Sequence, residues 1–290
     1  MGSGSYSYMA ARGRSVERKD MARSMGASAF REEMFKQRQI DPDMVIKGKV
    51  RESRDSDEHP ESFPIIIALD TTGSMGHIPH NLITGAFPEI MKNILEAGVA
   101  DPQVCFIGVG DCYCDNAPIQ CGQFESSDEL MEKWFQKVYL EGGGGSNPGE
   151  SYNLTWYFAA RHTSTDAWEK RKKKGVVITI GDEACLAEIP ASNIKNLFGD
   201  PAQSGATSRE LLAEVKECWE PYHIHIGTGT SYYDTAIMKW KDLIGEDRLE
   251  VLPRENYPVV ATITGLVLKA YGKPADTVAT TAADDPKIML

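Results

Sequence analysis

The chain contains a short apolar run that leads into a turn rich in hydroxyl groups, Pro64-Ile65-Ile66-Ile67-Ala68-Leu69-Asp70-Thr71-Thr72-Gly73-Ser74-Met75. A run of this length, made largely of β-branched residues and bounded by proline and aspartate, is typical of a strand that is buried on both faces. Residues 104–109 and 176–180 have the same character, and residues 222–226 and 249–252 form weaker runs. The sequence therefore predicts five strands, the first of which ends next to Asp70.

Helical spacing appears between these runs. Apolar residues fall on one stripe over residues 82–95 and on another over residues 211–218. Strands that alternate with helices predict the α/β class, with a mostly parallel, doubly wound sheet and helices on both faces. Ligands of such sheets bind beyond the carboxyl ends of the strands, so the residues that follow each strand are the candidates for a functional site.

The composition is that of a globular protein, with 41% hydrophobic and 25% charged residues in a chain of 290. The net charge of −11 argues against a nucleic-acid binder and against attachment to a membrane through basic residues. The longest apolar run, residues 65–69, is far shorter than the roughly 18 residues that cross a bilayer. The first eight residues lack the apolar core of a signal peptide, and six cysteines do not make a disulfide scaffold in a chain of this size. We therefore expect a cytoplasmic protein with reduced thiols.

Composition also suggests how the chain is divided. Residues 1–38 hold eight basic and four acidic side chains, and Gly26 interrupts a weak helical period there. Residues 51–62 are charged and turn-rich. We expect a basic N-terminal arm over residues 1–60 that is partly helical or disordered, a domain over residues 61–272, and a flexible tail over residues 273–290. The arm is either a solvated extension or a docking segment for a partner, including nucleic acid.

Three separate segments place oxygen ligands at the expected strand ends. Asp70, Thr72 and Ser74 follow the first strand, Ser146 follows the glycine run 142–145, and Asp182 follows the strand at 176–180. Carboxylates and hydroxyls are ligands for a hard cation such as Mg²⁺. Asn147, Pro148 and Glu150 resemble a capping box with proline at the first helical position, which predicts that a helix begins directly after Ser146.

These five positions resemble the metal-ion-dependent adhesion site of von Willebrand factor A (VWA) domains, and the resemblance covers about residues 60–270. Thr72 stands where the family commonly has Ser, Ser146 where it commonly has Thr, and Gly-Asp-Glu at 181–183 replaces the common Asp-Gly, so Glu183 is the alternative to Asp182. The resemblance implies a Rossmann-like sheet with one short antiparallel edge strand, near residues 119–124. It also implies a bound Mg²⁺, with Mn²⁺ or Ca²⁺ as alternatives, and an open coordination position for a carboxylate of a partner protein.

Four stretches narrow the resemblance to intracellular bacterial or phage VWA proteins, namely residues 140–145, 150–152, 159–163 and 180–183. Some relatives of that kind work with MoxR-type AAA+ ATPases. The resemblance therefore implies an adaptor or partner of such an ATPase, or of a similar intracellular assembly, with no membrane partner. Two other functions stay open: a metal-dependent hydrolase with Asp182 or Glu183 as the base, and an assembly component docked through its basic arm.

Known catalytic patterns are missing from the sequence, so we expect no enzymatic activity, no catalytic residues and no organic cofactor. A phosphatase of the haloacid dehalogenase type needs a second aspartate where Thr72 stands. Neither glycine run, 142–146 or 227–230, ends in the Lys-Ser/Thr pair of a phosphate-binding loop. Asp111 could lie near the metal on the same face, or in a solvated loop.

Two further groups of residues could bind metal. Cys112, Cys114 and Cys121 lack a fourth ligand nearby, which favours unligated thiols. His223 and His225 alternate along one strand face, which favours exposed or hydrogen-bonded strand residues over metal ligands.

Overall fold

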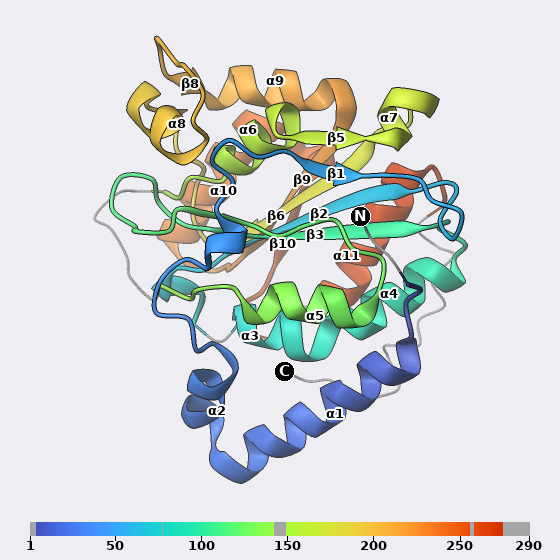
Figure 1. Ribbon diagram of the computed structural model, residues 1–290. Coiled ribbons are helices and arrows are strands. Elements are labelled where there is room, and N and C mark those ends of the chain that lie inside the picture. Colours follow the sequence, from blue (N-terminus) through green and yellow to red (C-terminus); the bar gives the residue numbers. More distant parts are fainter. Residues whose placement is uncertain (1–3, 77, 142–148, 256–257, 275–290) are drawn as a thin grey trace.

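A computed structural model describes residues 4–76, 78–141, 149–255 and 258–274 of the chain, and it is built around a central sheet of six strands (Figure 1). In spatial order the strands are β10 (Leu249–Leu252), β9 (Trp219–Ile226), β6 (Gly175–Gly181), β2 (Phe63–Asp70), β3 (Pro102–Val109) and β4 (Ile119–Cys121). Neighbouring strands are parallel except at one edge, where β4 runs antiparallel to β3. The predicted strands and the short antiparallel edge strand are therefore confirmed.

Side chains of successive strand residues enter two separate cores, one on each face of the sheet. Ile65 and Ile67 of β2 belong to the core that includes side chains of α4, α5 and α11. Ile66 and Ala68 belong to the core that includes side chains of α6, α9 and α10. The bounds of these helices are α4 (Phe87–Glu96), α5 (Asp128–Gln136), α11 (Val259–Tyr271), α6 (Asn153–Arg161), α9 (Ser208–Cys218) and α10 (Ser231–Ile244). Figure 1 shows the two helical layers below and above the sheet, which confirms the doubly wound α/β class.

Both predicted helical stripes correspond to helices. The first is continuous from α3 (Ile78–Asn81) through a π-helical turn (Leu82–Ala86) into α4. The second is α9, which begins with a capping box between Thr207 and Glu210. Further short elements are η1 (Pro42–Met44), η2 (Gly73–Met75), α7 (Asp166–Arg171), β7 (Glu188–Ile189), α8 (Ala191–Leu197), β8 (Ala206–Thr207) and η4 (Glu246–Arg248). Within the described ranges, no helix has both the length and the apolar character needed to cross a membrane.

The N-terminal segment forms two helices, α1 (Tyr8–Met25) and α2 (Ala27–Met34), separated by Gly26 in a positive-φ conformation. Ion pairs hold α1 against α5, because Arg14 pairs with Asp128 and Glu132, and Arg18 lies 3.0 Å from Glu132. Figure 1 shows α1 running beneath the helical layer that contains α4 and α5. Two basic side chains of this segment, Arg14 and Arg18, thus contact acidic side chains of α5.

A second, two-stranded sheet lies above the central one, formed by the parallel strands β1 (Arg51–Ser53) and β5 (Thr163–Thr165). The charged, turn-rich character of residues 51–62 does not reveal the strand that the first three of them form. A strand of three residues is too short to show an alternating pattern, and its partner lies more than a hundred residues away.

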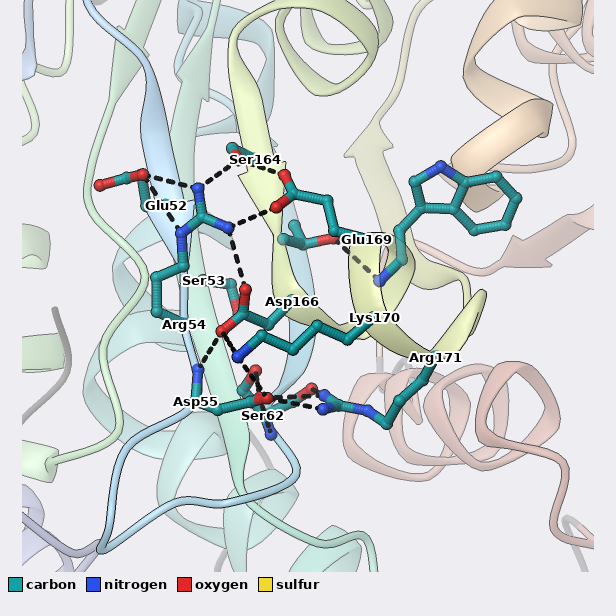
Figure 2. Close-up of polar contacts among 12 residues, drawn as sticks. Glu52, Ser53, Arg54, Asp55, Ser62, Ser164, Asp166, Glu169, Lys170 and Arg171 are labelled. Atoms are coloured by element: carbon teal, nitrogen blue, oxygen red, sulfur yellow. Dashed lines mark hydrogen bonds and ion pairs between the residues drawn. The ribbon is translucent and has the colours of Figure 1, made fainter.

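Ion pairs connect the end of β1 to α7 (Figure 2). Arg171 donates to both carboxylate oxygens of Asp55, at 2.7 and 3.0 Å, and Lys170 lies 3.2 Å from the same carboxylate. Arg54 lies 3.0 Å from Asp166. Burial alone would raise the pKa of Asp55, but the hydrogen bonds from Arg171, Ser62 and Lys170 outweigh it and hold the pKa well below its usual range. The charged form of Asp55 therefore stabilises this junction.

Replacing Asp55 with asparagine should lower the free energy of unfolding by about 1–3 kcal/mol at pH 7, because charge-assisted hydrogen bonds are lost. The pKa of Asp55 is depressed in the folded state, so its stabilising effect is present above about pH 4 and declines as the pH falls below that value. Urea unfolding at pH 7 and pH 3 measures both effects. Asp57→Asn, at an exposed position nearby, is the control and should change little at either pH. A difference that grows toward acid would contradict the assignment.

Candidate metal site

The carboxyl end of β2 carries a turn that is organised around one buried carboxylate. Asp70 is the last residue of β2 and is 0% exposed. Its Oδ1 accepts hydrogen bonds from the backbone N–H of Thr72, at 2.8 Å, and from the Thr72 hydroxyl, at 2.6 Å. The Thr72 and Ser74 hydroxyl oxygens lie 3.2 Å apart. Three oxygen ligands predicted from the sequence are thus close to one another at the expected strand end.

Asp182 follows β6, the parallel neighbour of β2, so the two strand ends meet. The Ser74 hydroxyl donates to Asp182 Oδ1 at 2.7 Å, and Asp182 is 2% exposed. The alternative ligand Glu183 is engaged elsewhere, because the Tyr232 hydroxyl donates to its carboxylate. This geometry favours Asp182 over Glu183. Ser146, the fifth predicted ligand, lies outside the residues that the structure describes.

Two buried carboxylates in this position are costly without a cation. Burial raises the pKa of Asp70 to about 6, although hydrogen bonds from Thr72 and Tyr152 act in the opposite direction, and the charge of Asp182 raises it further. Carboxylate and hydroxyl oxygens are the donor set that Mg²⁺, Mn²⁺ and Ca²⁺ prefer. Within the described ranges, no three His, Cys, Asp or Glu side chains are grouped so as to hold a metal ion. A metal at Asp70 and Asp182 would therefore depend on the hydroxyls.

Tyr152 completes the surroundings of Asp70 and was not anticipated from the sequence. It lies just before α6, is fully buried, and its hydroxyl donates to Asp70 Oδ2 at 2.7 Å. Gly181, at the end of β6, makes room for it, because a Cβ atom there would overlap the hydroxyl oxygen and lie 2.6 Å from Cζ of the tyrosine ring. A glycine at the end of a buried strand was the one available signal of this close approach.

Arg254 is the second residue that sequence reasoning missed. It follows β10, and its guanidinium Nη1 donates to Asp182 Oδ2 at 2.8 Å and to the Tyr233 hydroxyl oxygen at 3.0 Å. Its Nη2 donates to the backbone carbonyl of Ser74. No motif in the sequence marks this arginine, because its contacts depend on three distant elements.

Glu150 lies in a β-bridge with Cys185, and α6 begins only at Asn153. The predicted helix start directly after Ser146 is therefore wrong for the described residues 149–152, because the Glu150 backbone pairs with Ala184 and Leu186 and the Ser151 N–H donates to the Gly110 carbonyl. Glu150 is 6% exposed, and its Oε2 has no hydrogen-bond partner among the described residues. Burial, together with the charges of Asp70, Asp115 and Asp111, raises the pKa of Glu150 to about 10. Glu150 is therefore protonated near neutral pH in the absence of a cation.

Asp111 is buried and organises the turn after β3. Its Oδ1 accepts a hydrogen bond from the backbone N–H of Tyr113 at 2.9 Å, and its own N–H donates to Asp115 at 2.7 Å. Because Asp111 is only 1% exposed, the alternative of a solvated loop residue is wrong. None of the six cysteines forms a disulfide.

His223 and His225 are both buried on the face of β9 toward α10, and of the two expected states, exposed or hydrogen-bonded, His223 adopts the second. The His223 ring stacks on the Trp240 ring, with 3.6 Å between the two ring centroids. The His223 Nδ1 lies 2.8 Å from the Thr179 hydroxyl oxygen. His225 has no hydrogen-bond partner for either ring nitrogen among the described residues. Burial lowers the pKa of His225 to about 4, so it is neutral at pH 7.

No family model matches the sequence, and no curated protein matches it. Among solved structures, the chain is similar to the pilus adhesin SpaC from Lactobacillus rhamnosus GG in its open conformation, with 10% identity and a TM-score of 0.49 over 80% of this chain and 31% of that one. It is also similar to proximal thread matrix protein 1 from the mussel byssus, with 14% identity and a TM-score of 0.45 over 78% of this chain and 49% of that one. A second structure of the mussel protein, described as having a zinc-occupied MIDAS motif, gives 13% identity and a TM-score of 0.45, with 78% and 47% of the two chains covered. The chain thus spans less than half the length of each of these proteins.

Proposed function

We propose that the chain is a divalent-metal-dependent protein-interaction module of the VWA type. The observation that carries the proposal is the contact between Ser74 and Asp182, which joins the turn after β2 to the end of β6 in an arrangement made only of oxygen ligands. Asp70, Thr72, Ser74 and Asp182 would hold the ion, together with Ser146 from the glycine-rich segment. A bound ion supplies an electrophilic position that accepts a carboxylate from a partner protein.

The chain's own residues prepare this position. The Thr72 backbone and hydroxyl and the Tyr152 hydroxyl fix the orientation of Asp70, and Ser74 fixes that of Asp182. Two aspartates supply just enough negative charge to balance a divalent ion, and neutral hydroxyl ligands add none. The ion would therefore still attract one further carboxylate, and the matching partner is a protein with an accessible aspartate or glutamate. Mg²⁺ is the proposed ion because it is the abundant divalent cation of the cytosol.

The finer assignment rests on the sequence resemblance to intracellular bacterial or phage VWA proteins. It makes the chain an adaptor or partner of a MoxR-type AAA+ ATPase or of a similar assembly, and it places the chain in the cytoplasm. A pull-down from host lysate tests this, with wild type, Asp70→Ala and the exposed control Asp57→Ala, each in Mg²⁺ and in chelator. A partner held by wild type and by Asp57→Ala only with Mg²⁺, and not by Asp70→Ala, is the expected result. Retention of the partner in chelator would contradict the metal-bridged mechanism.

A non-catalytic role is part of the proposal. Of the surplus carboxylates near the site, Glu150 is protonated near neutral pH and therefore cannot act as a base there. Burial and the charge of Asp182 raise the pKa of Glu183 to about 7, so Glu183 is the carboxylate that a hydrolase would use as its base. Phosphoester turnover that requires Mg²⁺ and disappears in Asp70→Ala would instead favour a metal-dependent hydrolase.

A further inference from the structure

Arg254 brings a positive charge to the edge of the candidate metal site. Its side chain is 37% exposed and lies in the segment between β10 and α11. It contacts three elements: the carboxylate of Asp182 after β6, the carbonyl of Ser74 in the turn after β2, and the hydroxyl of Tyr233 on α10. The guanidinium therefore joins the two segments that would share the ion.

The position of the guanidinium is fixed by packing as well as by charge. Gly227 has a φ of 142°, and a Cβ atom there would lie 2.6 Å from the Tyr233 ring. Only glycine fits both this backbone conformation and this close approach. The Tyr233 backbone N–H also donates to the Thr230 hydroxyl at 3.2 Å, at the start of α10. The tyrosine that anchors Arg254 is thus itself held in place.

Charge balance indicates what Arg254 does. Asp70 and Asp182 carry two negative charges in a nearly water-free position, and Arg254 supplies one positive charge at hydrogen-bond distance from Asp182. Without a divalent ion, this contact offsets part of the cost of burying the two carboxylates. With a divalent ion bound, the same guanidinium would be a like charge close to the ion, and it would compete with the ion for Asp182 Oδ2.

We propose that Arg254 is a tethered counter-cation of the site, which stabilises the ion-free protein and lowers the affinity of the site for divalent metal. This inference rests on the proposed function, because it concerns regulation of the same metal site. The positive charge of Arg254 therefore raises the metal concentration that is needed to occupy the site. Loss of that charge should therefore change ion-free stability and metal affinity in opposite directions.

Calorimetric titration of the full chain with Mg²⁺ and with Mn²⁺, together with thermal unfolding in chelator, tests this proposal. Arg254→Gln should bind metal at least tenfold more tightly than wild type and should unfold at a lower temperature in chelator. Arg254→Lys, which keeps the charge, should stay within about threefold of the wild-type affinity. The matched control is Arg248→Gln, which removes an arginine that pairs with Glu220 at the other end of β10 and should leave metal affinity unchanged.

Unchanged or weaker metal binding by Arg254→Gln would overturn the inference, since a purely structural arginine would lower stability without tightening binding. If Arg254→Gln does not fold, Tyr233→Phe serves instead, because it removes one anchor of the guanidinium. It should bind metal two- to threefold more tightly, and unchanged or weaker binding again overturns the inference. If wild type and all variants fail to bind either metal, the proposed function itself fails, and that outcome is distinguishable from equal affinities across the series.

Discussion

Asp70→Ala should abolish saturable Mg²⁺ binding by the chain, with a loss of affinity of at least about 100-fold. Asp70 supplies one of the two carboxylates of the candidate site, and it also organises the Thr72 backbone and hydroxyl. The variant should still fold, because removing a fully buried carboxylate also removes its desolvation cost. Titration calorimetry and the metal-induced rise in melting temperature measure the effect.

The control for this prediction is Asp57→Ala, which removes an exposed carboxylate from the same chain and should bind metal as wild type does. Asp182→Ala should resemble Asp70→Ala, whereas Glu183→Ala should retain metal binding because Asp182, and not Glu183, contacts Ser74. Saturable binding that survives in both aspartate variants would show that the ion binds elsewhere.

Gly181→Ala is the second substitution with a large expected effect, a loss of about 3 kcal/mol in the free energy of unfolding. The new methyl group would overlap the Tyr152 hydroxyl and lie 2.6 Å from Cζ. The ring cannot move freely, because Tyr152 is fully buried and packs against His223 and Trp240. A displaced Tyr152 would also lose its hydrogen bond to Asp70, so metal affinity should fall with stability.

Denaturant unfolding of Gly181→Ala, with and without Mg²⁺, measures both consequences. The double variant Gly181→Ala/Tyr152→Phe removes the overlapping oxygen and should recover part of the lost stability, although the ring carbons still crowd the methyl group. Gly13→Ala is the control, because a Cβ atom at this position in α1 meets no other atom within 4 Å and alanine favours a helix. Wild-type stability of Gly181→Ala would show that the ring and strand separate without cost.

The parts of the site that sequence could predict are those that depend on local pattern and on one rule of topology. Asp70, Thr72 and Ser74 lie within five residues of one another, and Asp182 directly follows a strand that the apolar pattern reveals. Because parallel strands end at the same edge of a sheet, these side chains could be placed together before any coordinates were known. The parallel strands of the central sheet followed from the same kind of reasoning, whereas its antiparallel edge strand was implied by the resemblance to VWA domains.

Other features depended on contacts between distant segments, which leave no periodic signal. The strand β1 exists because β5 pairs with it, and Glu150 is not helical because its backbone pairs with Ala184 and Leu186. Whether His223 and His225 are exposed was decided by α10, which covers that face of β9 with Trp240. In each case a partner far away in the sequence overrode a weak local preference.

By itself, then, the sequence determined the α/β sheet and the presence of two carboxylates and two hydroxyls at the ends of adjacent strands, because periodicity and turn chemistry are local properties. Only the tertiary structure decided that Tyr152 holds Asp70, that Asp182 and not Glu183 faces the Ser74 hydroxyl, and that Arg254 lies against the site. Those relations join residues about 70 to 180 positions apart, and burial and charge fix them only when the chain is folded.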